Sequence, residues 1–82
     1  MTGGQCLEAR RLLGLTQRRL AKALGLSQAQ ISIFEITGVM PRAQHNKRDR
    51  VADLLAYLEQ AGVEFVEENG GGRGVRLRRN DT

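Results

Sequence analysis

The sequence predicts a mostly α-helical domain that ends in a β-hairpin. Between residues 16 and 35, two short stretches with apolar residues at three- and four-residue spacing flank a glycine. A further apolar stripe follows residue 50, and after residue 62 the pattern changes to alternation on either side of a glycine run. Because 82 residues allow only one small core, we expect four to five helices and one hairpin.

The first of the two central helices is bounded by residues that suit helix ends. Thr16 is placed as an N-cap. The apolar stripe that follows consists of Leu20, Ala21 and Leu24. Gly25 can adopt positive φ just past the helix end, and Ser27 can cap a second helix. The chain is therefore predicted to stop, turn and restart within three residues.

The second central helix has an apolar side and a side of small or flat residues. Ile31 and Phe34 are predicted to point inward. The residues expected on the other side are Gln28, Ala29, Ser32 and Ile33. Glutamine can make a bidentate hydrogen bond to adenine in the major groove, and apolar side chains can contact the thymine methyl. Two helices joined by such a turn, with the second entering the groove, are typical of a helix-turn-helix.

Residues Leu15 to Glu35 closely resemble the lambda-repressor-like, Cro/Xre-type helix-turn-helix family. The shared pattern is L-T/S-Q-x-x-L-A-x-x-x-G-hydrophobic-S-x-x-x-I-S-x-x-E. The resemblance implies a lambda-repressor-like fold and a DNA-binding transcriptional regulator that reads double-stranded DNA with the helix from Ser27 to Glu35. It covers about a quarter of the chain at motif level, and about three quarters with the flanking helices.

The resemblance also implies roles for individual residues. Gln17, at the start of the first central helix, is expected to hold a phosphate, and Arg42 to contact the DNA backbone. The full set of expected DNA-binding residues is Thr16, Gln17, Ser27, Gln28, Ala29, Ser32, Ile33 and Arg42. For Arg10 two interpretations stay open, an ion pair with Glu35 or a solvated side chain.

The chain departs from the family pattern after the glutamate. The family usually has glycine two residues later, where this chain has Thr37 followed by Gly38. The helix is therefore expected to run one residue longer or to end in a different turn. Ile36, Val39 and Met40 are less polar than a phosphate-facing segment, so they either pack under the following helix or form a protein-contact patch.

Composition narrows the class of protein. The net charge is +4 and the pI is near 10.2, which favours a polyanionic partner, while acidic residues gather between positions 51 and 72. Cys6 is alone and is interpreted as a core residue, and His45 as a surface residue, so no metal or cofactor site and no catalytic group is expected. With no signal peptide and no long apolar run, we expect a cytoplasmic protein without membrane contact.

Two further helical segments are predicted. Residues 5–13 carry an apolar face, and residues 1–4 are expected to be frayed. After Pro41 the chain can restart as a helix, with Asn46 or an earlier polar residue as the cap. Its apolar stripe consists of Val51, Leu54, Leu55 and Leu58. Whether residues 42–61 form one helix or two is open.

The last segment predicts a hairpin whose register follows from its apolar faces. A three-residue loop centred on Gly70 sets Phe65 opposite Val75 and Val63 opposite Leu77, whereas a two-residue turn would mix the faces. A lone hairpin is marginal in water, so it must lean on its own helices or on a second copy. These four residues are the expected homodimer contacts.

These observations divide the chain into a helix-turn-helix domain over residues 1–62, a dimerisation hairpin over residues 63–79 and a tail over residues 80–82. The predicted function is that of a bacterial or phage-type homodimeric repressor without enzyme activity. Two alternatives remain, an antitoxin that binds a toxin and represses its own operon, and a protein-interaction module that holds a partner through its apolar loop.

Overall fold

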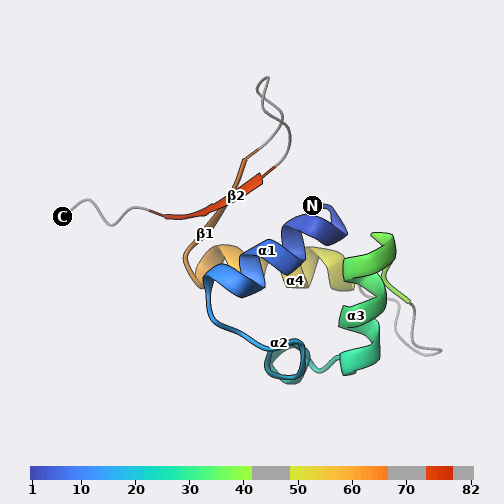
Figure 1. The fold of residues 1–82 in the computed structure, drawn as a ribbon. Helices are drawn as coiled ribbons and strands as arrows, with labels where there is room; N and C mark the ends of the chain where they lie inside the picture. The colour runs from blue at the N-terminus through green and yellow to red at the C-terminus, as the bar shows by residue number, and fades with distance from the viewer. Residues whose placement is uncertain (42–48, 67–73, 79–82) are drawn as a thin grey trace.

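The computed structural model describes residues 1–41, 49–66 and 74–78. Within them lie four α-helices and one two-stranded antiparallel sheet, so the predicted fold class is confirmed. The elements are α1 (Gly3–Leu12), α2 (Gln17–Leu24), α3 (Gln28–Thr37), α4 (Arg50–Gln60), β1 (Val63–Val66) and β2 (Gly74–Leu77). In Figure 1, α1 and α4 cross the middle of the molecule, α2 is seen nearly end-on below them, α3 lies to one side and the hairpin rises above.

Helix α1 begins earlier than the sequence predicts, because Thr2 and Gln5 form a capping box. The Thr2 hydroxyl oxygen accepts from the Gln5 N–H at 3.0 Å, and the Gln5 Oε1 atom accepts from the Thr2 N–H at 2.8 Å. Two donors at the helix start are satisfied in this way. The expectation that residues 1–4 are frayed is therefore wrong, since Gly3 and Gly4 belong to the helix.

Helix α4 begins at Arg50. Its N-cap is Asp49, whose carboxylate accepts from the Ala52 N–H at 3.1 Å. The expected cap, Asn46, lies outside the described residues, as does the segment that would show whether another helix precedes α4. Helix α4 itself ends at Gln60, close to the predicted end, and Gly62 with a φ of 111° leads directly into β1.

The core draws on every helix and on the first strand. Its fully buried members include Phe34, Leu20, Ile31, Leu54 and Leu58 from the helices, together with Val63 from β1. Partly buried Phe65 and Val75 pack against the same cluster. The two strands therefore lean on the helices of their own chain, which buries the apolar face that an isolated hairpin would expose.

The strand register is the predicted one. Val63 pairs with Leu77, Glu64 with Arg76 and Phe65 with Val75. On the other face of the sheet, Arg76 Nε donates to the Glu64 carboxylate at 2.8 Å. The loop centred on Gly70 lies outside the described residues.

Candidate nucleic-acid interface

Helices α2 and α3 are joined by a turn in which each helix end is capped. The Thr16 hydroxyl accepts from the Arg19 N–H at 3.0 Å, and Gly25 ends α2 with a φ of 68°. Ser27 and Gln30 then form a capping box at the start of α3, with N···O distances of 2.9 and 3.1 Å. Thr16 and Ser27, two of the predicted DNA-binding residues, thus shape the helix starts from exposed positions.

Helix α3 has a dry side and an open side. Ile31 and Phe34 are fully buried, as predicted. At about 3.6 residues per turn, the opposite half of the helix carries a different group of residues. These are Gln28, Ala29, Ser32, Ile33 and Ile36, which we call the outer face of α3. Gln28 and Ala29 are exposed, Ser32 is half-buried, and Ile33 and Ile36 are 43% and 81% exposed.

Ile36 belongs to this face although the sequence-based prediction did not include it. Its spacing of seven from Ala29 and four from Ser32 is the signal that would have found it. Helix α3 runs to Thr37 and ends at Gly38, whose φ is 76°, as one of the two expected outcomes of the departure from the family pattern. Because the helix continues for two residues beyond Glu35, Ile36 stays on the outer face and does not enter the loop.

The loop after α3 is divided between surface and core. Val39 is 66% exposed, whereas Met40 packs against the core. Ile36 and Val39 therefore do not pack under α4. The Thr37 hydroxyl donates to the Ile33 carbonyl at 2.8 Å and accepts from the Val39 N–H at 3.1 Å, which fixes the turn. Gln30 Nε2 donates to the Pro41 carbonyl at 3.0 Å and holds the chain beyond it.

A buried carboxylate joins the first three helices. Arg10 donates to Glu35 through Nε at 2.9 Å and through Nη2 at 3.1 Å, and Gln17 Nε2 donates to the same carboxylate at 2.9 Å. The Cys6 thiol contacts it at 3.6 Å. Of the two interpretations of Arg10, the structure shows the ion pair, and the Glu35 side chain is only 4% exposed.

These contacts set the charge state of the Glu35 carboxylate. Burial acts to raise its pKa, but the hydrogen bonds from Arg10, Gln17 and Cys6 outweigh burial, so the pKa lies below its ordinary value. Glu35 is therefore ionised at neutral pH. Its charge is compensated by Arg10, which leaves the outer face of α3 without a net charge.

Gln17 lies at the start of α2, where the predicted phosphate contact would be made. Its side-chain amide nitrogen carries two hydrogens, and one of them is used on Glu35. A shallow hollow lies here between the start of α2 and the start of α3. The residues around it are Arg10, Gly14, Leu15, Thr16, Gln17, Arg18 and Gln28. Helix N-termini of this kind favour anions.

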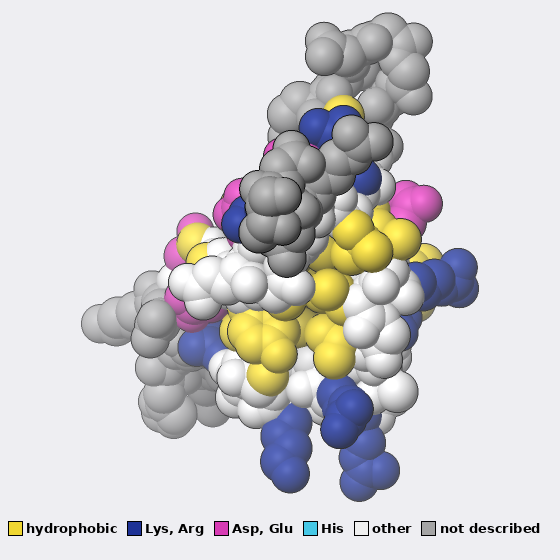
Figure 2. Space-filling model, turned by 90° about the vertical axis from the view of Figure 1, so that its left-hand side faces the viewer, with side chains coloured by type: hydrophobic (Ala, Val, Ile, Leu, Met, Phe, Trp, Pro, Cys, Tyr) yellow, Lys and Arg dark blue, Asp and Glu magenta, His cyan; other side chains and the backbone are white. Residues whose placement is uncertain are grey.

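Basic side chains are exposed along α2. Arg18, Arg19 and Lys22 are all exposed. Figure 2 shows Lys and Arg side chains projecting from the lower edge of the molecule, where Figure 1 places α2. Arg50, in contrast, points inward, donating to the Leu24 carbonyl at the end of α2 and pairing with Asp53 at 3.3 Å. Arg42 lies outside the described residues.

The predicted dimer residues differ in exposure. Val63 is fully buried within its own chain, Phe65 and Val75 are half-buried, and Leu77 is 51% exposed. A second copy could therefore reach Val63 only through its main chain. Gln5, which the sequence analysis did not single out, is buried and donates through Nε2 to the Gly74 carbonyl at 3.1 Å. This bond ties the start of β2 to α1.

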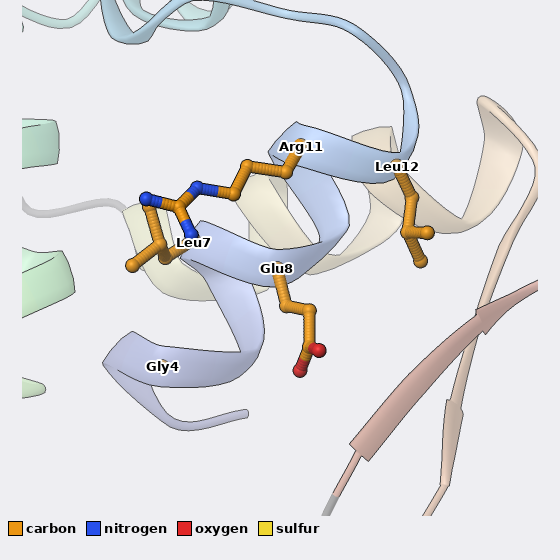
Figure 3. A pocket seen from close by; sticks show the side chains of 5 residues that line it. All are labelled: Gly4, Leu7, Glu8, Arg11 and Leu12. Carbon is orange, nitrogen blue, oxygen red and sulfur yellow. The ribbon is translucent and has the colours of Figure 1, made fainter.

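A second hollow among the described residues lies on α1, away from the outer face of α3. A pocket on the outer side of α1 is lined by Gly4, Leu7, Glu8, Arg11 and Leu12, and the Glu8 and Arg11 side chains extend in different directions there (Figure 3). In the part of the chain that the structure describes, no three His, Cys, Asp or Glu side chains gather as a metal would require. No helix among those residues is both long and apolar enough to cross a membrane.

Comparison with known proteins agrees with this geometry. A family model described as helix-turn-helix matches residues 7–35, which span most of α1, all of α2 and α3 up to Glu35. No curated protein matches the sequence. The matched segment contains the two capped helices, the turn at Gly25 and the Glu35 carboxylate that joins them. Residues 7–35 are thus similar to the Cro/C1-type helix-turn-helix family, which supports a DNA-binding helix-turn-helix domain in this part of the chain.

Proposed function

We propose that the protein is a sequence-specific transcriptional regulator, a repressor, that inserts α3 into the major groove of double-stranded DNA. The observation that carries this proposal is the outer face of α3, which is open along its length while the opposite side is anchored in the core. Gln28 stands at the first position of this helix and is exposed. Its amide can read adenine, with Ala29 and Ser32 beside it.

Phosphate contacts would fix α3 in the groove. The start of α2 presents main-chain N–H groups that no helix carbonyl satisfies, and Gln17 retains one amide hydrogen beyond the bond to Glu35. Glu35 holds the Gln17 side chain at the hollow before DNA arrives, so less side-chain entropy is lost on binding. Exposed Arg18 and Arg19 add positive charge nearby.

A homodimer would place two copies of α3 on one DNA site, and the hairpin supplies a route to it. Arg78 N–H donates to the Gly62 carbonyl, so by the alternation of an antiparallel pair the main-chain groups of Val75 and Leu77 point away from β1. Because Leu77 is also the most exposed apolar side chain of the hairpin, we place the contact with the second copy at β2. The DNA site would then be roughly palindromic, with half-sites about 34 Å apart or a multiple of it.

A second candidate function rests on a different observation. Ile36 and Val39 are the two most exposed large apolar side chains among the described residues. Such a patch can hold a protein partner, as in an antitoxin that binds a toxin and also represses its own operon. In that reading the same residues serve the partner, and DNA is read by Gln28 and its neighbours alone.

Selection of binding sites from random duplex DNA tests the proposal. We expect a palindromic site at modest salt, which represses a reporter gene when placed over its promoter. Gln28→Ala should weaken the free energy of binding to that site by about 1 to 3 kcal/mol and relax the sequence preference at one base pair. Gln60→Ala, an exposed glutamine at the end of α4, should bind as the unchanged protein does. If no site can be selected, the DNA-reading assignment fails and the partner-binding candidate replaces it.

A further inference from the structure

The outer face of α3 lacks the side chains that most often read guanine. Arginine and lysine make the commonest specific contact in the major groove, a bidentate bond to guanine O6 and N7. Helix α3 contains neither, and its one charged residue, Glu35, is buried in the pair with Arg10. Aspartate or glutamate contacts to cytosine are excluded in the same way. Gln28 is therefore the only long polar side chain on the outer face, and its amide suits adenine.

The rest of the outer face is apolar. Ala29 is exposed, Ile33 is 43% exposed and Ile36 is 81% exposed. Around the helix axis Ile36 falls between Ser32 and Ala29, so it stands in the middle of the open side. Apolar side chains of this size that stay in water do not contribute the favourable free energy of burial. In the major groove only one base presents an apolar group at its edge, and that group is the C5-methyl of thymine.

We infer that α3 reads an A·T-rich half-site, in which Gln28 binds adenine and the Ile33 and Ile36 side chains pack against thymine methyl groups. This inference rests on the proposed function and adds the composition of the DNA site to it. The apolar residues share one helix face with Gln28 and Ser32, and that face is continuous with the polar hollow at the start of α2. This continuity favours DNA over a protein partner as the molecule that covers them.

The dimensions of the helix set the spacing of the contacts. Gln28 and Ile36 are eight residues apart, which is about 12 Å along the axis. With base pairs about 3.4 Å apart, the outer face spans about three to four base pairs. The thymine contacted by Ile36 is therefore expected about three base pairs from the adenine bound by Gln28, on the side of the dimer axis or away from it according to how α3 enters the groove.

Single-atom changes in the DNA test this inference on the full-length protein. Starting from the selected duplex, each thymine is replaced in turn by deoxyuridine, which removes only the methyl group. At one or two positions we expect binding to weaken about fourfold, the equivalent of one buried methyl group. Replacing the adenine three base pairs away by 7-deazaadenine should weaken binding through loss of the Gln28 contact.

Double-mutant cycles identify the side chain that touches each methyl group. In the Ile36→Ala variant, uracil at the thymine that Ile36 contacts should cause no further loss of affinity. The Gln28→Ala variant should keep the full loss of affinity at that position. The matched control is Leu12→Ala, because Leu12 is 41% exposed on α1 and lies outside the outer face of α3 (Figure 3). This variant should respond to uracil as the unchanged protein does.

The outcomes separate this inference from the proposed function. A selected site that depends on Gln28 but is rich in G·C, or that tolerates uracil at every thymine, overturns the inference and leaves the proposed function standing. Failure to select any site overturns the proposed function itself. If Ile36→Ala leaves both affinity and the uracil response unchanged, the apolar residues do not read DNA, and the protein-partner reading of this patch takes their place.

Discussion

At the scale of single residues, Gly3 and Gly4 are neighbours in α1 with opposite constraints. A Cβ atom on Gly3 would lie 2.3 Å from the Phe34 carbonyl oxygen and 2.6 Å from that of Glu35, and both are main-chain atoms that cannot move alone. On Gly4 the nearest atom would be the Thr2 hydroxyl at 3.9 Å. The absence of a side chain at Gly3 is what lets the start of α1 approach the end of α3.

This contrast gives a paired prediction. Gly3→Ala should lower the free energy of unfolding by about 1 to 3 kcal/mol, because helix α1 must shift away from α3. Gly4→Ala should raise it by up to about 1 kcal/mol, since alanine favours the helix and meets open space. Urea denaturation of the two variants measures both effects. Equal stability of the two would contradict the close approach of the helices.

The burial of Cys6 gives a second test at the scale of single residues. Its side chain is fully buried, and burial, followed by the nearby Glu35 carboxylate, raises the pKa of the thiol to about 12. A thiol reagent at neutral pH should therefore react with unfolded protein only. Cys6→Ala should cost about 1 kcal/mol of stability, against about 2 to 5 for Leu20→Ala or Phe34→Ala. Rapid labelling of the native protein would show that Cys6 is not a core residue.

At the scale of elements, Glu35 connects α1, α2 and α3 in a way that depends on pH. Its pKa is lowered in the folded protein, so ionised Glu35 contributes stability at pH values above its ordinary, unfolded pKa. As pH falls through the lower, folded pKa, that contribution is lost. The orientation of Gln17 at the start of α2 depends on the same carboxylate.

Glu35→Gln tests this connection. At neutral pH the substitution should cost about 1.5 to 3 kcal/mol, because charge-assisted hydrogen bonds to Arg10 are replaced by weaker ones. Between neutral pH and pH 3 the variant should lose less stability than the unchanged protein. Glu8→Gln is the control, since Glu8 is exposed and has no ion-pair partner among the described residues. An acid loss of equal size in all three proteins would rule out a special role for Glu35.

At the scale of the whole molecule, the hairpin belongs to the protomer's core and is also proposed to hold a second copy. Cutting the chain after Gly62 would remove Val63 from the core and the Gln5 bond to Gly74, so it would confuse folding with assembly. Leu77→Asp is the sharper change, because this side chain is half exposed. We expect a dimer at micromolar concentration by sedimentation, and a folded monomer after Leu77→Asp.

The matched control is Val39→Asp, which alters an exposed apolar residue in the loop after α3. It should leave the dimer intact. A wild-type protein that sediments as a monomer, or a Leu77→Asp variant that stays dimeric, would show that β2 is not the contact between copies.

The local elements of this protein follow from its sequence. Thr16, Gly25 and Ser27 are residues whose preferences act over three or four positions, so α2, the turn and the start of α3 could be predicted from them. The hairpin register could be predicted for a similar reason, since a three-residue loop puts Val63, Phe65 and Val75 on one face whereas a two-residue turn would mix the faces. The inward positions of Ile31 and Phe34 follow from helical spacing.

The tertiary structure decided what those elements do to one another. For Arg10 the sequence left an ion pair with Glu35 and a solvated side chain open, and the tertiary structure decided for the pair. No pattern shows that Gln17 shares the Glu35 carboxylate or that Gln5 binds the Gly74 carbonyl. The exposure of Ile36 depends on α3 continuing to Thr37 and on which side of α3 the helices α1 and α2 leave uncovered. Periodicity reports which face of a helix is apolar, whereas burial and pairing are fixed only when distant segments pack, because these energies arise between residues far apart in the chain.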